Sequence, residues 1–133
     1  MNKLILSAAI VLLGACATAQ PQVDEQAVAD FVAVRELPEL DAIRLDTAND
    51  SWYELNQYYV IYETRRGSYL FRFARRCWEL DEQRVVADRR WDANTLRARF
   101  DTLRGCRIDN IFDLTEADVI ELKDLGRAPG SQD

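Results

Sequence analysis

The chain has 133 residues, of which 48% are hydrophobic and 30% are charged, and its formal net charge is −6. This composition is typical of one folded domain and excludes a collagen-like, fully disordered or multi-domain chain. The sequence contains no histidine. That excludes Ser-His and Cys-His catalysis, zinc or haem sites with histidine ligands, and a pH switch that depends on histidine.

Residues 1–15 have the pattern of an export signal. Lys3 precedes an apolar run from Leu4 to Leu13. Ten helical residues rise about 15 Å, which is half of the roughly 30 Å hydrocarbon core of a bilayer. The run is therefore too short to span a membrane and is typical of a signal peptide that is removed on export.

The apolar run ends in Leu13-Gly14-Ala15-Cys16, which resembles the lipobox of bacterial lipoproteins. The resemblance implies that the peptide is cut before Cys16, that its thiol carries diacylglycerol, and that the new amine is acylated with a fatty acid such as palmitate. Because two or more acyl chains hold a protein firmly to a bilayer, Cys16 would be a permanent anchor. The alternative is an ordinary signal peptide cut after Ala15, Ala17 or Ala19.

The residue after Cys16 is Ala17. In enterobacterial lipoproteins an Asp at this place commonly signals retention in the inner membrane, so its absence favours the outer membrane and its periplasmic face. Small and polar residues follow, and they are typical of a tether. We expect a lipoprotein signal peptide at 1–15, a lipidated N-terminus and tether at 16–34, a β-rich domain at 35–126 and a frayed tail at 127–133.

Cysteine parity predicts a disulfide in the domain. Once Cys16 carries lipid, Cys77 and Cys106 remain, and an even number of cysteines in an oxidising compartment favours a bond between them. It would close a loop of about 30 residues and contribute roughly 3–4 kcal/mol on the chain-entropy model. The alternatives are two separate buried thiols or a redox pair, although a redox pair usually has the CxxC spacing that is absent here.

Alternating apolar and polar residues predict short β-strands in the middle of the chain. The clearest hairpin pairs 58–63 with 68–74 through a turn at residues 64–67, in which Gly67 can adopt a positive φ angle. Weaker signals predict strands at 42–47, 84–88, 96–101 and 106–112, with one or two helical turns at 77–83.

Two of these strands carry a specific expectation. In 96–101, alternation places Leu96, Ala98 and Phe100 on one face of a half-exposed strand. In 106–112, the alternation runs from Cys106 to Ile108 and then breaks before Ile111.

The end of the chain is predicted to be helical. Thr115 can cap the helix, and Asp118 stands at the third helical position, a variant of the capping box. An apolar stripe follows and ends before Gly126, at Val119, Ile120, Leu122 and Leu125. The expected fold is mainly β: a small antiparallel sheet or barrel of five to six strands, with the C-terminal helix covering one face or an open edge.

Several short motifs between 42 and 125 resemble an uncharacterised family of short proteobacterial lipoproteins, a domain of unknown function. They are Trp52 before a strand, Tyr69-Leu70, the Cys-x-x-Leu at Cys77, and the Cys-x-Ile-x-x-Ile at Cys106. Many members carry a further cysteine before the last strand pair, and residues 92–101 have none. The resemblance therefore implies that Cys77 and Cys106 pair within the domain, and it implies no activity.

Pairs of acidic residues suggest one enzymatic alternative, a glycan hydrolase. Paired carboxylates hydrolyse glycosidic bonds, and the pairs Asp46/Asp50 and Asp109/Asp113 are the candidates. Neither pair lies in a distinctive motif, so solvated charges and turn or cap residues are the favoured interpretation. The two domain cysteines without histidine make no zinc site alone, and we expect no metal or cofactor.

Charge is unevenly distributed along the chain. Residues 63–107 contain 12 Arg and 7 acidic residues, whereas the segments on either side are acidic. The basic segment includes three doublets, Arg65-Arg66, Arg75-Arg76 and Arg89-Arg90, whose guanidinium groups could bind lipid phosphates, an anionic glycolipid such as lipopolysaccharide, or an acidic protein. The favoured alternative is that acidic segments neutralise them as surface pairs. Nucleic acid is not an expected partner of an acidic, exported chain.

Three tryptophans, Trp52, Trp78 and Trp91, flank predicted strands or turns. They could form a stacking platform for a glycan or a peptide. In a small domain that needs large side chains, core packing is the favoured interpretation, with Trp91 partly exposed because polar residues surround it.

Taken together, these patterns favour a membrane-anchored, periplasm-facing lipoprotein that acts through its surface as a non-enzymatic binding or assembly module of the cell envelope. Its partners would be the membrane, through the lipid anchor, and an envelope protein or anionic glycolipid. The alternatives are a carboxylate-dependent glycan hydrolase and a binder of anionic lipid or lipopolysaccharide through the Arg doublets.

Overall fold

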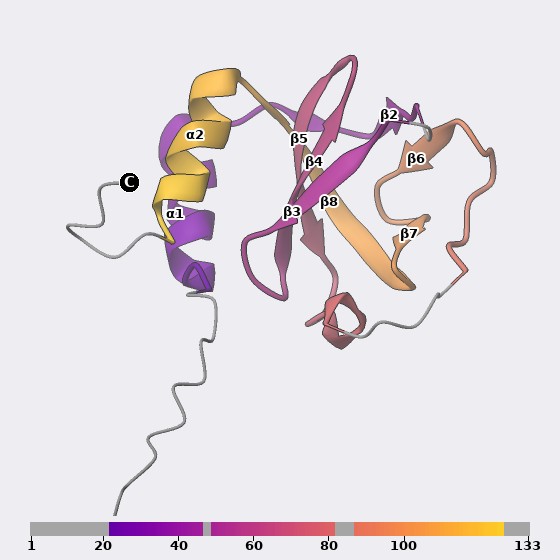
Figure 1. Cartoon of the computed structure of the whole chain (residues 1–133), viewed down its shortest axis with the longest axis horizontal. Helices are drawn as coiled ribbons and strands as arrows, with labels where there is room; N and C mark the ends of the chain where they lie inside the picture. The colour runs from indigo at the N-terminus through magenta and orange to yellow at the C-terminus, as the bar shows by residue number, and fades with distance from the viewer. Residues whose placement is uncertain (1–21, 47–48, 82–86, 127–133) are drawn as a thin grey trace, which may run out of the picture.

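The computed structural model describes residues 22–46, 49–81 and 87–126 (Figure 1). In these residues the elements follow the order α1 (Glu25–Arg35), β1 (Glu39–Leu40), β2 (Ala42–Arg44), β3 (Ser51–Glu54), β4 (Tyr59–Thr64), β5 (Gly67–Phe73), the 3-10 helix η1 (Trp78–Leu80), β6 (Thr95–Arg97), β7 (Thr102–Leu103), β8 (Cys106–Leu114) and α2 (Glu116–Asp124).

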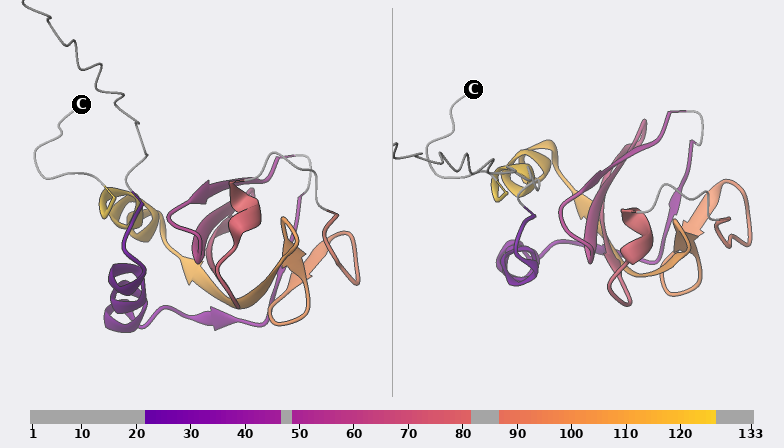
Figure 2. Two further views of the ribbon diagram at one scale, coloured as in Figure 1. Left: turned by 90° about the horizontal axis from the view of Figure 1, so that it is seen from below. Right: turned by 60° about the horizontal axis from the view of Figure 1, so that its bottom comes forward.

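The strands form two antiparallel sheets. The main sheet has the order β1-β8-β5-β4-β3, with β7 also paired to β8, and the second sheet is the pair β2-β6. Figure 2 shows that the main sheet is strongly curved and that β2-β6 lies across its concave side. The strands described do not close into a barrel. The prediction of a mainly β fold with a small antiparallel sheet and a C-terminal helix is confirmed.

The hairpin β4-β5, which the sequence predicts, lies in the middle of the main sheet and is buried on both faces. Its residues pair in register, with Val60 opposite Phe71 and Ile61 opposite Leu70. Because neighbouring residues of a strand point to opposite faces, Val60 and Phe71 face one core and Ile61 and Leu70 face the other. The ring of Tyr62 stacks on that of Phe71 with centroids 4.9 Å apart.

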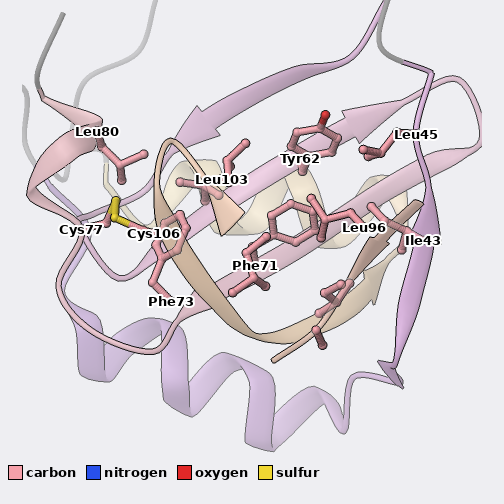
Figure 3. Close-up of a cluster of buried hydrophobic side chains, with 14 residues drawn as sticks. Ile43, Leu45, Tyr62, Phe71, Phe73, Cys77, Leu80, Leu96, Leu103 and Cys106 are labelled. Carbon is pink, nitrogen blue, oxygen red and sulfur yellow. A yellow bond between two sulfur atoms is a disulfide. The ribbon is translucent and has the colours of Figure 1, made fainter. Parts of the chain in front are cut away.

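The two cores lie on opposite sides of this sheet. The first, between the main sheet and β2-β6, includes Ile43, Leu96 and the two domain cysteines (Figure 3). The second lies under α1 and α2, which cover the other face (Figure 1), and includes Val28, Phe31 and Leu122. The helices thus complete the layer that the sheet alone would leave exposed to water.

The N-terminal boundary of the domain differs from the expected one. Residues 25–34, which we expected in the tether, belong to α1, and Val28 and Phe31 are buried. Asp24 caps this helix by accepting a hydrogen bond from the N–H of Ala27 at 3.1 Å. The segment looks like a linker because it is rich in Ala and polar residues, but Val28 and Phe31 lie on one helical face and fill the second core. Residues 16–21, which include Cys16, lie outside the described residues.

The predicted strand 96–101 is too long. β6 ends at Arg97, and Arg99 takes a left-handed conformation with φ 69°. Asp101 closes this turn, since its carboxylate accepts a hydrogen bond from the N–H of Arg97 at 2.7 Å. The turn directs Phe100 outward, so it does not share a face with Leu96 and Ala98, which are buried.

The remaining predicted elements are present only in part or with different burial. Of 77–83, residues 78–80 form η1. Of 84–88, residues 84–86 lie outside the described residues, and 87–88 are in no strand. The capping box of Thr115 and Asp118 is present at the start of α2. Along that helix Val119 and Leu122 are buried, whereas Ile120 and Leu125 are exposed.

Candidate functional site

Cys77 and Cys106 form a disulfide with their Cα atoms 5.8 Å apart. The bond joins the segment after β5 to the start of β8 at one end of the first core (Figure 3), and both cysteines are fully buried. The N–H of Cys77 donates to the carbonyl of Gln57 at 2.8 Å. The bond therefore ties together segments of the sheet that are distant in sequence, as the sequence predicts.

Glu79 lies beside this disulfide. One of its carboxylate oxygens is 3.0 Å from the sulfur of Cys106, and the other accepts a hydrogen bond from Arg75 at 2.7 Å. The hydrogen bond from Arg75 is the main reason that the pKa of Glu79 lies below its ordinary value. Cys77, Glu79 and Cys106 bring three ligand atoms within 4.8 Å of one another, but sulfurs bonded to each other are not thiolates and do not bind a metal as the structure stands.

The three Arg doublets do not form one site. Arg65-Arg66 lies in the β4-β5 turn and Arg75-Arg76 follows the far end of β5. A strand of seven residues is about 20 Å long, so the two doublets are separated by the length of β5. Arg89-Arg90 lies in the segment before β6.

Most doublet arginines already have a partner in the domain. Arg65 pairs with Asp46 at 3.3 Å, and Arg90 pairs with Asp88 at 3.3 Å. Arg76 bonds to Gln57, and its guanidinium carbon lies 4.0 Å from the centre of the Trp78 ring. These contacts agree with neutralisation at the surface rather than with a shared anion site.

The two predicted carboxylate pairs have different arrangements. Asp109 and Asp113 stand four residues apart on β8, which is about 13 Å at the rise of a strand. Asp50 accepts hydrogen bonds from the N–H of Asp46 at 3.1 Å and from the hydroxyl of Tyr62 at 3.0 Å. Burial of Tyr62, followed by its hydrogen bond to Asp50, raises the pKa of the phenol. Asp50 thus anchors the loop before β3.

Two cavities in the described part of the chain lie away from these pairs. A mostly apolar one of about 470 Å³ lies between the β4-β5 turn and α2, and Glu63 and Glu116 are among its lining residues. Glu63 is already paired with Lys123 at 3.1 Å. The other, of about 390 Å³, lies beside the N-terminus of α1 and includes Gln57 and Arg76.

The expectation that the tryptophans pack in the core is wrong. The exposed fractions are 38% for Trp52, 54% for Trp78 and 86% for Trp91. Trp91 is the one for which the sequence predicts exposure. The three side chains lie on different segments, in β3, in η1 and in the loop before β6.

A cluster of two exposed aromatic side chains and one half-buried arginine, which the sequence does not predict, lies around β6. The guanidinium carbon of Arg97 is 5.8 Å from the centre of the Trp91 ring and 5.1 Å from that of Phe100. Phe100 is 69% exposed. We refer to these three residues as the aromatic–arginine patch. A non-glycine residue at positive φ, Arg99, creates the turn that exposes Phe100, and no local pattern in the sequence signals it.

A model of one protein family matches residues 1–130, nearly the whole chain. The chain belongs to the family of unknown function DUF6491. The sequence-based prediction of an uncharacterised domain family is therefore confirmed. Neither a curated protein nor a solved structure matches this DUF6491 chain. Among the residues described, no helix has the length and apolar character needed to cross a bilayer.

Proposed function

We propose that this DUF6491 chain is a proteobacterial lipoprotein, anchored through Cys16 at the periplasmic face of the outer membrane, whose domain is a non-enzymatic binding or assembly module of the cell envelope. The observation that carries the proposal is the disulfide between Cys77 and Cys106. Stable disulfides are typical of exported proteins. Since the pair uses two of the three cysteines, Cys16 is the remaining thiol and stands where a lipobox requires one.

Binding rather than hydrolysis is supported by how the acidic side chains are used. Asp46 and Asp50 hold a loop and an arginine in place, and Asp109 and Asp113 are too far apart along β8 to share one sugar ring. Retaining and inverting glycosidases need carboxyl groups about 5 Å and 6.5–9.5 Å apart, respectively. The glycan hydrolase alternative therefore has no support from either predicted pair.

Mass spectrometry of the protein extracted from membranes tests the anchor. The expected mass lacks residues 1–15 and includes diacylglycerol and one further acyl chain on Cys16. Without reductant, neither Cys77 nor Cys106 should react with an alkylating reagent. A Cys16→Ser variant is the matched control, and it should lose the lipid and leave the membrane fraction. An unprocessed leader, or alkylation of both domain cysteines, would contradict the proposal.

A turnover assay tests the choice between binding and catalysis. The purified protein is incubated with isolated cell-wall glycan, and newly formed reducing ends are measured. We expect no release above that of an Asp50→Asn variant. Release that disappears in this variant would establish the hydrolase and overturn the binding module.

A further inference from the structure

The aromatic–arginine patch has two exposed aromatic side chains beside a half-buried arginine. The N–H and the Nε of Arg97 lie 2.7 Å and 3.5 Å from the carboxylate of Asp101, which is 2% exposed. This buried carboxylate holds the arginine beside two aromatic rings that remain open to water. Large aromatic side chains gain most from leaving water, so a surface that exposes two of them beside a cation is suited to contact with a partner.

The patch lies in the basic part of an acidic molecule. Residues 87–107 contain six Arg and three Asp. By contrast, each helix with its flanking residues, 24–36 and 115–124, contains four acidic residues and one basic residue. Figure 1 shows the two helices at one end of the long axis and β6 and β7 at the other. Charge complementarity therefore favours an anionic surface at the β6 end.

The proposed anchor determines which anionic surface is nearest. Five residues lie between Cys16 and Gln22, the first described residue, and the six extended Cα–Cα steps from one to the other span about 20 Å at most. The domain would therefore stay close to the lipid headgroups, where a tethered group has a high effective concentration. Guanidinium groups bind lipid phosphates, and aromatic side chains favour the headgroup layer.

We propose that the aromatic–arginine patch binds an anionic, phosphate-bearing lipid surface. This inference rests on the proposed lipid anchor and adds a second contact to it. Trp91 and Phe100 enter the headgroup layer. Among the described residues, the guanidinium of Arg97 is hydrogen-bonded through its Nε to Asp101, so its other N–H groups donate to phosphate. Because α1, the first described element, lies at one end of the domain and β6, which carries Arg97, lies at the other (Figure 1), the two contacts lay the long axis along the membrane.

The fluorescence of Trp91 tests this contact. The full lipidated protein is reconstituted into vesicles of phosphatidylcholine, either alone or mixed with phosphatidylglycerol. The signal of Trp91 is obtained as the difference between the wild type and a Trp91→Phe variant. We expect its emission to shift to shorter wavelength, and brominated acyl chains to quench it, in the mixed vesicles alone. High salt should reverse both effects.

Two variants test whether contact with the anionic lipid belongs to the aromatic–arginine patch or occurs at any exposed tryptophan. Arg97→Gln should lower the equilibrium constant for docking of the patch about fivefold, the effect expected from one cation near an anionic surface. Trp78 is the matched control, since it is also exposed and lies against an arginine, Arg76. Its signal, isolated with Trp78→Phe, should be the same in both kinds of vesicle.

The outcomes for the patch and for the anchor are distinct. Equal emission of Trp91 in both kinds of vesicle would overturn the lipid contact and leave an acidic protein as the occupant of the patch. Failure of the protein to float with phosphatidylcholine vesicles would instead contradict the anchor. In that case the purified soluble protein is mixed with phosphatidylglycerol vesicles, and the Trp91 shift still decides whether the patch binds lipid.

Discussion

Ile108 and Ile111 lie three residues apart on one strand, yet both are fully buried in the same core. Strict alternation would place them on opposite faces. The pairing of β5 with β8 explains the difference, because Arg72 is opposite Asn110 and Phe73 is opposite Ile108. Asp109 is thus the extra residue of a β-bulge, and the bulge returns Ile111 to the concave side of the sheet.

The position of the bulge predicts how three substitutions change the free energy of unfolding. Ile108→Ala and Ile111→Ala should each lower the free energy of unfolding by about 2–5 kcal/mol, since each leaves a cavity in the same core. Asn110→Ala, at the position that strict alternation would bury, should cost less than about 1 kcal/mol. Urea denaturation followed by circular dichroism measures all three. A cost for Asn110→Ala as large as that for Ile111→Ala would contradict the register.

Local patterns were sufficient to predict some elements. The β4-β5 hairpin combines aromatic and β-branched residues with a turn at Arg65-Arg66, just before Gly67, and α2 carries its own cap at Thr115. The break between Ile108 and Ile111 was visible in the sequence, but only the pairing with β5 shows that it is a bulge. The sequence does not predict α1, because its buried residues, Val28 and Phe31, are few and lie among Ala and polar residues.

The candidate site was harder to predict, for a physical reason. Neighbouring arginines in the sequence suggested an anion site, but strand β5 separates Arg65-Arg66 from Arg75-Arg76. The aromatic–arginine patch, by contrast, brings together residues that are not neighbours in the sequence. Trp91 and Phe100, six and three positions from Arg97, both lie near its guanidinium group. That meeting depends on the turn at Arg99 and on the buried carboxylate of Asp101, and both are tertiary features.

Removing the disulfide should destabilise the domain without changing its fold. The cysteines are 29 residues apart in sequence, and on the chain-entropy model a loop of that length contributes about 3–4 kcal/mol. A Cys77→Ala, Cys106→Ala double variant, which leaves no free thiol in the domain, should therefore unfold at a markedly lower urea concentration. The wild type with dithiothreitol should approach the variant. Equal urea midpoints for the variant and the oxidised wild type would show that the disulfide does not contribute to the stability of the domain.

The end of α1 offers a stabilising substitution. Glu36 takes a left-handed conformation with φ 50°, and the N–H groups of Glu36 and Leu37 donate to the carbonyls of Ala33 and Val32. Glycine is the residue that adopts this conformation without steric cost. Glu36→Gly should raise the free energy of unfolding by up to about 1 kcal/mol, as measured in urea. Val34→Gly, inside the same helix and also exposed, is the control and should lower it by a similar amount.

Tyr62 should make the stability of the domain depend on alkaline pH. Burial of its ring and its hydrogen bond to Asp50 raise the pKa of Tyr62 in the folded state, whereas the unfolded chain keeps the ordinary value of about 10. Below pH 10 both states carry the phenol proton, and the stabilisation is fully present. As pH rises above 10, the unfolded state loses its proton first, so the free energy of unfolding falls by up to about 1.4 kcal/mol per pH unit for this one group.

A Tyr62→Phe variant tests this dependence. At pH 8 it should be less stable than the wild type by about 1 kcal/mol, because the hydrogen bond to Asp50 is lost. Between pH 10 and 11 its stability should fall less steeply, so the two curves converge. Urea unfolding at a series of pH values gives both curves, and subtracting them removes the titration of the other tyrosines. Parallel curves across this range would mean that the phenol of Tyr62 ionises in the folded protein as readily as in the unfolded chain.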